Sequence, residues 1–379
     1  MNKFKKIFYI WLILAFVVIL FHPTLYYVYV GKVFPKDGSI VGDLARMTYS
    51  IDLIDKRYVD INLERKHINH FLYNGENIDL ITIGDSFSEG AGGGKNPYYQ
   101  DYIANNFNLN VLNINMAKDN KNYIETIYGL LNSGKLEEKN VKYILIESVQ
   151  RRSLERFSIN DINRQIVIED FDIFKGFHQD FIKPEKNVDL SFLQVILNMF
   201  KKTDKDEVSV INNLNQNALI YNLRFELKGY GKMSSHVYRE KLNKDFFSTK
   251  VSNELLFYDE DLKYLNLETK ENIELLNENF NILARDLLQK GIKLIFMPAV
   301  DKYNLYRPYI ISNNYKESIF FEYLETLPKE YIFINTKKIL SKELENGDKD
   351  IYYADDTHWS YKASQAIVNS TKFIEGLRD

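Results

Sequence analysis

The chain of 379 residues contains no cysteine. This absence excludes a disulfide framework, a zinc site built on thiolates and a thiol nucleophile, and it is compatible with either redox compartment. The net charge is only −3, so nothing in the composition indicates the basic surface that nucleic-acid binding requires. With 45% hydrophobic residues, the chain can bury the core of one large domain, or of one domain with an insertion.

A cofactor motif is also missing. The glycines up to Gly94 do not form a phosphate-binding loop, because Lys95 is followed by Asn96 and the first glycine of that motif would fall on Glu89. We expect neither a cofactor nor a metal ion in the site.

The first 31 residues have the pattern of a signal anchor. Three lysines within the first six residues precede an apolar run over 7–21, which continues more weakly over 24–30 with three tyrosines. Together the two runs are long enough to cross a bilayer, and tyrosines are typical of the membrane interface. No small-residue cleavage site follows, and the preceding basic residues indicate a cytoplasmic N-terminus. We expect a single-pass anchor with the rest of the chain outside the membrane.

Short apolar runs alternate with helical patterns in two parts of the chain, which predicts an α/β fold with a parallel sheet of about five strands. The predicted strands are 78–83, 110–113, 142–148, 293–297 (stopped by Pro298) and 331–334, and the predicted helices are 97–107, 122–131, 269–289, 316–327 and 360–376. The expected organisation is an anchor over 1–31, a linker or packing segment over 32–76, a core made of 77–152 and 266–379, and an insertion over 153–265 of unassigned fold.

A serine follows the first predicted strand. Gly84, Asp85 and Ser86 end the apolar run 78–83 and begin a polar, glycine-rich stretch. A serine at the carboxyl end of a buried strand is presented above the sheet edge, where open α/β sheets place their chemistry. The alternative is a helix N-cap, which Asp and Ser both favour. We interpret Ser86 as a nucleophile and Asp85 as a turn-forming residue.

A histidine near the C-terminus follows two acids. Asp355 and Asp356 precede His358 by three and two residues, close enough for a carboxylate to turn back onto the ring. A serine nucleophile needs a base to take its proton, and the base needs an acid that fixes its tautomer and stabilises the imidazolium. The alternative is a surface turn that happens to contain a histidine.

These motifs resemble those of the SGNH (GDSL-like) hydrolase superfamily. The similarity is greatest to its Asp-x-His-Trp branch, which includes the alginate O-acetyltransferases and related membrane-anchored polysaccharide acetylases. The matching segments are Gly84–Ser86, Glu147–Arg151, Met297–Tyr303 and Asp356–Trp359. The resemblance implies a flavodoxin-like three-layer sandwich over roughly 75–150 and 270–375, to which an N-terminal transmembrane helix and a large insertion are added.

The resemblance also implies roles for individual residues. Ser86 would be the nucleophile and His358 the base, oriented by Asp356 or, with the spacing found in many SGNH enzymes, by Asp355. Related enzymes supply oxyanion donors from a glycine after the second strand and an asparagine after the third, and this chain has neither. Arg151 or Asn115 would have to donate instead. Gly84 and Trp359, which flank the two motifs, complete the oxyanion or substrate-binding candidates.

The function implied is serine-dependent O-acetylation of a cell-surface or secreted polysaccharide by a membrane-anchored, extracytoplasmic enzyme. By resemblance, a membrane-bound acyltransferase would supply the acetyl group and the polysaccharide would accept it. Two alternatives stay open: an SGNH acetylesterase, which uses the same triad with water as the acceptor, and a non-catalytic polysaccharide-binding or assembly subunit.

Overall fold

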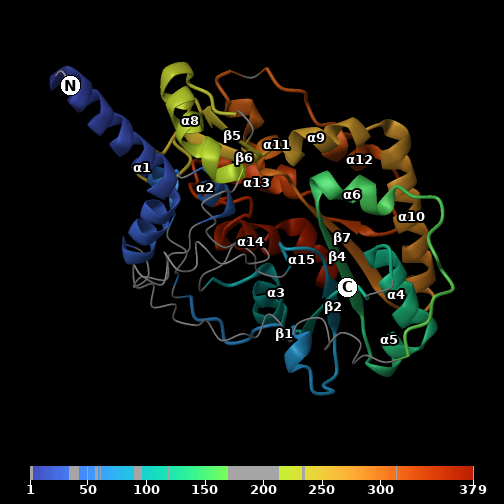
Figure 1. Cartoon of the computed structure of the whole chain (residues 1–379). Helices are drawn as coiled ribbons and strands as arrows, with labels where there is room; N and C mark the ends of the chain where they lie inside the picture. The colour runs from blue at the N-terminus through green and yellow to red at the C-terminus, as the bar shows by residue number, and fades with distance from the viewer. Residues whose placement is uncertain are drawn as a thin grey trace.

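The computed structural model describes residues 3–33, 42–48, 50–55, 59, 61–88, 96–117, 120–169, 213–232, 235–312 and 314–378. Six parallel strands form the central sheet of this part of the chain, in the order β1-β3-β2-β4-β7-β8 (Figure 1). Their bounds are β1 Ile68–Asn69, β2 Leu80–Ile83, β3 Val111–Ile114, β4 Tyr143–Val149, β7 Lys293–Ala299 and β8 Ile332–Phe333. The predicted α/β fold with a parallel sheet is confirmed.

The strand order agrees with a flavodoxin-like, doubly wound sheet. Without the short edge strand β1, the order is the 2-1-3-4-5 of that fold. Among these five strands the chain begins with β2 and adds strands first on one side and then on the other, so the topological switch point lies between β2 and β4. Ligands bind outside the carboxyl ends of the strands at such a point. The residues that follow β2 therefore leave the sheet at the position most suited to a site.

Helices cover both faces of the sheet (Figure 1). α3, α13 and α14 pack on one side, while α4, α6 and α10 pack on the other, where Phe157, Phe280 and Phe296 form a contiguous aromatic contact. The helices that frame the sheet are α3 Tyr99–Phe107, α4 Tyr123–Asn132, α5 Lys135–Glu138, α6 Gln150–Phe157, α10 Lys270–Leu288, α11 Lys302–Tyr306, α12 Phe320–Thr326, α13 Thr336–Asn346, α14 Tyr361–Val368 and α15 Thr371–Arg378. Thr269 caps the N-terminus of α10, since its side chain accepts a hydrogen bond from Asn272 N.

The strand before Pro298, the C-terminal helix and the predicted linker each differ from the prediction. Pro298 lies inside β7 and does not end it, and its carbonyl accepts a hydrogen bond from Thr336 Oγ1 at 2.5 Å. The C-terminal segment 360–376 forms two helices, because α14 ends at Val368 and Ser370 precedes a new helix, α15. Segment 68–69, expected in a linker, instead adds the edge strand β1 beside β3.

The described part of the insertion contains a helix and a hairpin. α8 (Asn213–Lys228) precedes an antiparallel pair, β5 (Val237–Lys241) and β6 (Glu254–Tyr258), and α9 (Glu260–Lys263) leads back to the core. α2 (Asp43–Thr48), from the segment after the N-terminal helix, packs against α8 and β6. Residues 170–212 of the insertion lie outside the described part.

The N-terminal segment forms one long helix, α1, over Lys3–Val33 (Figure 1). Its described side chains include a run of exposed apolar residues, from Ile7 to Val18. Among the residues that the structure describes, no helix has the length and apolarity of a membrane span. The structure therefore does not confirm the transmembrane helix predicted for residues 1–31.

Candidate active site

The residues of the two predicted motifs meet above the carboxyl end of β2. Ser86 Oγ lies 2.7 Å from His358 Nε2, although 272 positions separate the two residues in the chain. His358 Nδ1 lies 2.6 Å from Asp356 Oδ1. A serine hydroxyl, an imidazole and a carboxylate therefore form one continuous hydrogen-bonded series, with His358 and Asp356 buried and Ser86 partly exposed. This is the arrangement that lets a histidine take the serine proton and a carboxylate fix the ring.

Asp356, and not Asp355, contacts the imidazole. Asp356 Oδ1 also accepts a hydrogen bond from the backbone nitrogen of His358 at 3.0 Å, which closes a tight turn between the two residues. The Asp355 carboxylate is directed elsewhere, because its Oδ2 accepts a hydrogen bond from Gly42 N at 2.7 Å. The geometry thus distinguishes the two acids that the sequence left as alternatives.

A buried glutamate on the neighbouring strand β4 supports the turn that carries Ser86. Glu147 Oε2 accepts hydrogen bonds from Asp85 N at 3.1 Å and from Ser88 Oγ at 2.8 Å. Burial, followed by repulsion from the Asp85 carboxylate, raises the pKa of Glu147 well above its usual range. A β-carbon on Gly84 would lie 2.4 Å from Glu147 Oε2 and 2.2 Å from Ser88 Oγ, so only glycine allows this close approach. Gly84 is therefore a packing requirement of the turn.

Asp85 is a turn-forming residue, as expected. Its Oδ2 accepts hydrogen bonds from Val149 N at 2.9 Å and from Arg156 Nη1 at 2.5 Å. Burial opposes ionisation of Asp85, but the Arg156 guanidinium outweighs it and lowers the pKa of this carboxyl. Asp85 therefore ties the turn after β2 to the end of β4 and to α6.

A buried lysine holds the loop that carries the acid and the base. Lys302, the first residue of α11, is 1% exposed, and its Nζ donates to the carbonyls of Tyr353 (2.7 Å), Ala354 (2.9 Å) and Asp356 (3.0 Å). Burial lowers the pKa of Lys302 to about 8, against the opposing attraction of Asp355 and Asp356. The sequence placed Lys302 in a family segment but assigned it no role; its structural role is to position the loop.

The environment of His358 favours its protonated form. Burial lowers the pKa of the imidazole, but attraction and hydrogen bonding from Asp356, with a further contribution from Asp43, outweigh burial and raise this pKa above its ordinary value of 6.5. A raised pKa makes an imidazole a stronger proton acceptor, which suits the role of base predicted for His358. Phe87 packs against the imidazole, with ring centroids 4.8 Å apart, and limits the ring's freedom to turn.

The remaining candidates occupy different positions around the site. Asn115 is buried directly after β3, and because Ile83 pairs with Ile114, it leaves the sheet beside Gly84. Trp359 is buried and packs edge-on against Phe87 at 4.8 Å, so it supports the site from within the core.

Arg151 is engaged with acids on two other elements. Its Nη1 donates to Asp301 Oδ1 at 2.8 Å and to Asp261 Oδ1 at 3.2 Å. These contacts link α6 to α9 and to the end of β7. They give Arg151 a structural role, while the oxyanion role stays a prediction from the sequence.

Sequence reasoning missed Asp43. This residue begins α2, and its carboxylate accepts hydrogen bonds from Thr357 N at 2.9 Å and from Thr357 Oγ1 at 2.6 Å; Thr357 lies between Asp356 and His358 in the chain. Asp43, Asp356 and His358 each offer a ligand atom within 4.8 Å of the others. Because these atoms already hydrogen-bond to one another or to Thr357, we interpret the cluster as an acid–base group and not as a metal centre.

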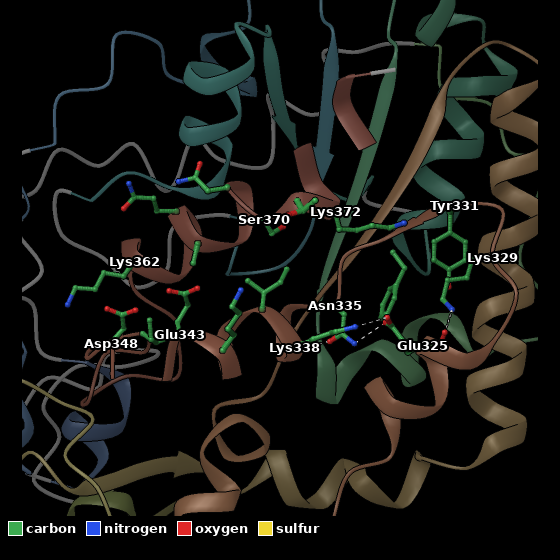
Figure 2. A pocket seen from close by; sticks show the side chains of 18 residues that line it. Glu325, Lys329, Tyr331, Asn335, Lys338, Glu343, Asp348, Lys362, Ser370 and Lys372 are labelled. Carbon is green, nitrogen blue, oxygen red and sulfur yellow. Dashed lines mark hydrogen bonds and ion pairs between the residues drawn. The ribbon is translucent and has the colours of Figure 1, made fainter. Parts of the chain in front are cut away.

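A large groove lies elsewhere on the molecule. It measures about 970 Å³, is bordered by residues of α12, α13, α14 and α15 beside β8, and is lined by many charged side chains (Figure 2). Figure 2 shows Asn335 at its wall, where Asn335 Nδ2 donates to Glu325 Oε2 at 3.0 Å. The residues lining the groove include none of Ser86, His358 and Asp356. This groove and the group formed by Ser86, His358 and Asp356 are therefore separate.

Comparison of the chain with protein-family models, with curated proteins and with solved structures gave no match.

Proposed function

We propose that the chain is a serine-dependent acyltransferase of SGNH type, which O-acetylates a polysaccharide through an acyl-enzyme on Ser86. The observation that carries this proposal is the hydrogen-bonded series from Ser86 Oγ through His358 to Asp356, at 2.7 Å and 2.6 Å. A chance surface histidine would not explain the convergence of residues from opposite ends of the chain above the switch point of the sheet. This convergence favours an enzyme over a binding or assembly subunit.

In the first half of the reaction, Ser86 Oγ attacks the carbonyl carbon of an acetyl donor while His358 Nε2 takes the hydroxyl proton. Asp356 stabilises the imidazolium that forms. Collapse of the tetrahedral intermediate breaks the bond to the leaving group, which receives the proton from His358, and leaves an acetyl ester on Ser86. The Ser86 backbone amide and the buried Asn115 are the candidate donors to the oxyanion.

In the second half, His358 removes a proton from the acceptor hydroxyl, whose oxygen attacks the acetyl ester. The bond to Ser86 Oγ breaks, the serine recovers its proton from His358, and the acetyl group leaves on the acceptor. Water in place of a sugar hydroxyl gives hydrolysis by the same steps, so the acceptor distinguishes transferase from esterase. The resemblance to polysaccharide acetylases favours the transferase, with a membrane-bound acyltransferase as the source of acetyl groups.

The proposal places the enzyme at the outer face of the cytoplasmic membrane, as the N-terminal sequence predicts. The exposed apolar side chains of α1 from Ile7 to Val18 support association with an apolar environment, which a bilayer or a membrane-bound partner supplies. Fractionation of cells that express the full chain tests this part: recovery in the membrane fraction supports it, and recovery in the cytoplasm contradicts it.

The activity is tested with the purified full-length chain and a chromogenic acetyl ester. We expect acetyl release to fall to background in Ser86→Ala and in His358→Ala. Addition of acetylated and unacetylated oligosaccharide acceptors then measures transfer against hydrolysis. Equal background rates in all three proteins would contradict the enzymatic proposal and favour the binding or assembly alternative. Release of acetyl to water, with none transferred to any added acceptor, would favour the esterase.

A further inference from the structure

The segment before the core reaches into the proposed catalytic loop. Gly42 N donates to Asp355 Oδ2 at 2.7 Å, Asp43 N donates to Asp356 Oδ2 at 3.2 Å, and Ala45 N donates to the Asp355 carbonyl at 3.0 Å. In the other direction, Thr357 donates both its backbone nitrogen and its hydroxyl to Asp43. These hydrogen bonds join two stretches more than 300 residues apart, and they involve both acids and the residue that separates the acid from the base.

We infer that Asp43 is a positioning residue of the proposed acyl-transfer site: it fixes Thr357 and, through it, the pairing of Asp356 with His358. The inference deepens the proposed function and rests on it. Asp356 Oδ1 faces the imidazole while its Oδ2 accepts from Asp43 N, so the backbone of Asp43 also orients the catalytic carboxylate. Removal of such a support lets the acid and the base drift, and a misplacement of about 1 Å typically costs about 10²-fold in rate.

The Asp43 carboxylate also acts through its charge. Burial, followed by repulsion from Asp356, raises the pKa of Asp43, while the imidazolium and the bonds from Thr357 oppose the rise. Asp43 in turn contributes to the raised pKa of His358. The charged and titratable groups that face Asp43 are Asp356 and His358 on the loop, Lys302 of α11, Asp261 of α9 and Tyr258 of β6, with Arg151 of α6 acting on His358.

The position of Asp43 depends on the insertion. Asn222 of α8 donates through Nδ2 to the carbonyl of Thr48, the last residue of α2, at 2.7 Å. Through α2, the insertion therefore holds the residue that positions the catalytic loop.

Two substitutions separate the hydrogen bonds of Asp43 from its charge. Asp43→Asn keeps an acceptor oxygen for Thr357 and removes the charge, whereas Asp43→Ala removes both. Asp52→Asn is the control, because Asp52 lies on the same segment, is about half exposed and pairs only with the exposed Lys250 in the ion pairs of the described residues. All are made in the full chain, and circular dichroism checks folding.

We expect Asp43→Asn to shift the acid limb of kcat/KM toward lower pH, because one negative charge near the imidazolium is lost. We expect Asp43→Ala to lower kcat about 10²-fold with KM changed less than threefold, and Asp52→Asn to match wild type. A wild-type acid limb in folded Asp43→Asn together with a wild-type kcat in Asp43→Ala would overturn the inference. If Ser86→Ala kept full activity, the proposed function itself would fail, which is a distinct result.

Discussion

Substitution of Gly84 by alanine is the most direct perturbation of the turn that carries Ser86. The added methyl group would lie 2.2 Å from Ser88 Oγ and 2.4 Å from Glu147 Oε2. Neither group is free to withdraw, because Ser88 Oγ also hydrogen-bonds to Tyr99 Oη at 2.7 Å and Glu147 Oε2 also accepts from Asp85 N. The turn must therefore move by on the order of 1 Å to reach a normal contact distance.

Two consequences have defined sizes. Overpacking a buried position costs about 1–3 kcal/mol, and a broken bond between Ser88 and Glu147 adds about 1 kcal/mol, so the free energy of unfolding should fall by about 2–4 kcal/mol. Displacement of Ser86 by about 1 Å should lower kcat for acetyl release about 10²-fold. Urea denaturation followed by circular dichroism measures the first quantity, and the chromogenic ester assay measures the second.

A matched substitution and a double substitution test the mechanism. Gly376→Ala places a β-carbon 3.1 Å from the Ile332 side chain inside α15, where alanine favours the helix, so activity should stay at wild-type level. Gly84→Ala combined with Ser88→Ala removes the closest contact and should lose less stability than the two single substitutions predict together. A Gly84→Ala protein with wild-type stability and rate would refute the steric reasoning.

Three further predictions concern the acid–base loop. Asp356→Asn should lower kcat about 10³–10⁴-fold, by analogy with triad carboxylates. Asp355→Ala should lower the free energy of unfolding by about 1–3 kcal/mol but lower kcat less than tenfold. Equal losses of kcat in the two proteins would contradict the assignment of Asp356 as the acid. The acid limb of kcat/KM should lie above pH 6.5, because the raised pKa of His358 keeps the imidazole protonated at lower pH. The same raised pKa means that protonated His358 stabilises the folded state. This contribution to the free energy of unfolding is complete below about pH 6.5 and is lost as the pH rises through the folded-state pKa. A limb at or below 6.5 would contradict that prediction. Lys302→Met should lower kcat about 10²-fold with KM little changed, because the three loop carbonyls lose the hydrogen bonds from Lys302 Nζ. The control is Lys362→Met, at a lysine whose side chain is partly exposed. Equal kcat values in the two variants would contradict the positioning role of Lys302.

The core strands could be predicted from the sequence, because strands that are buried on both faces form nearly continuous apolar runs. β4 is apolar almost throughout and is buried on both faces, as a central parallel strand must be. β1 is only two residues long and lies within a polar segment, so no periodicity could reveal it. Pro298 was expected to end β7, yet the strand includes it.

The site was predicted in part. Ser86 and His358 carry local signals, namely a serine after a buried strand and acids just before a histidine. The choice between Asp355 and Asp356 depends on which way each carboxylate points, and sequence spacing does not encode that direction. Asp43 could not be predicted, because its role arises from a tertiary contact with Thr357, 314 positions away. The supporting role of Glu147 left one signal in the sequence, since it is a charged residue inside a mostly apolar strand.

The proposed mechanism requires that Ser86 becomes acylated. The full-length chain is mixed with an activated acetyl ester, quenched in acid within the first turnover and digested, and the peptide that contains Ser86 is examined by mass spectrometry. The proposed mechanism predicts one added acetyl group on Ser86 in wild type, its accumulation when no acceptor is present, and its absence in His358→Ala. An unmodified Ser86 peptide in wild type, under conditions in which acetyl is released, would contradict the mechanism.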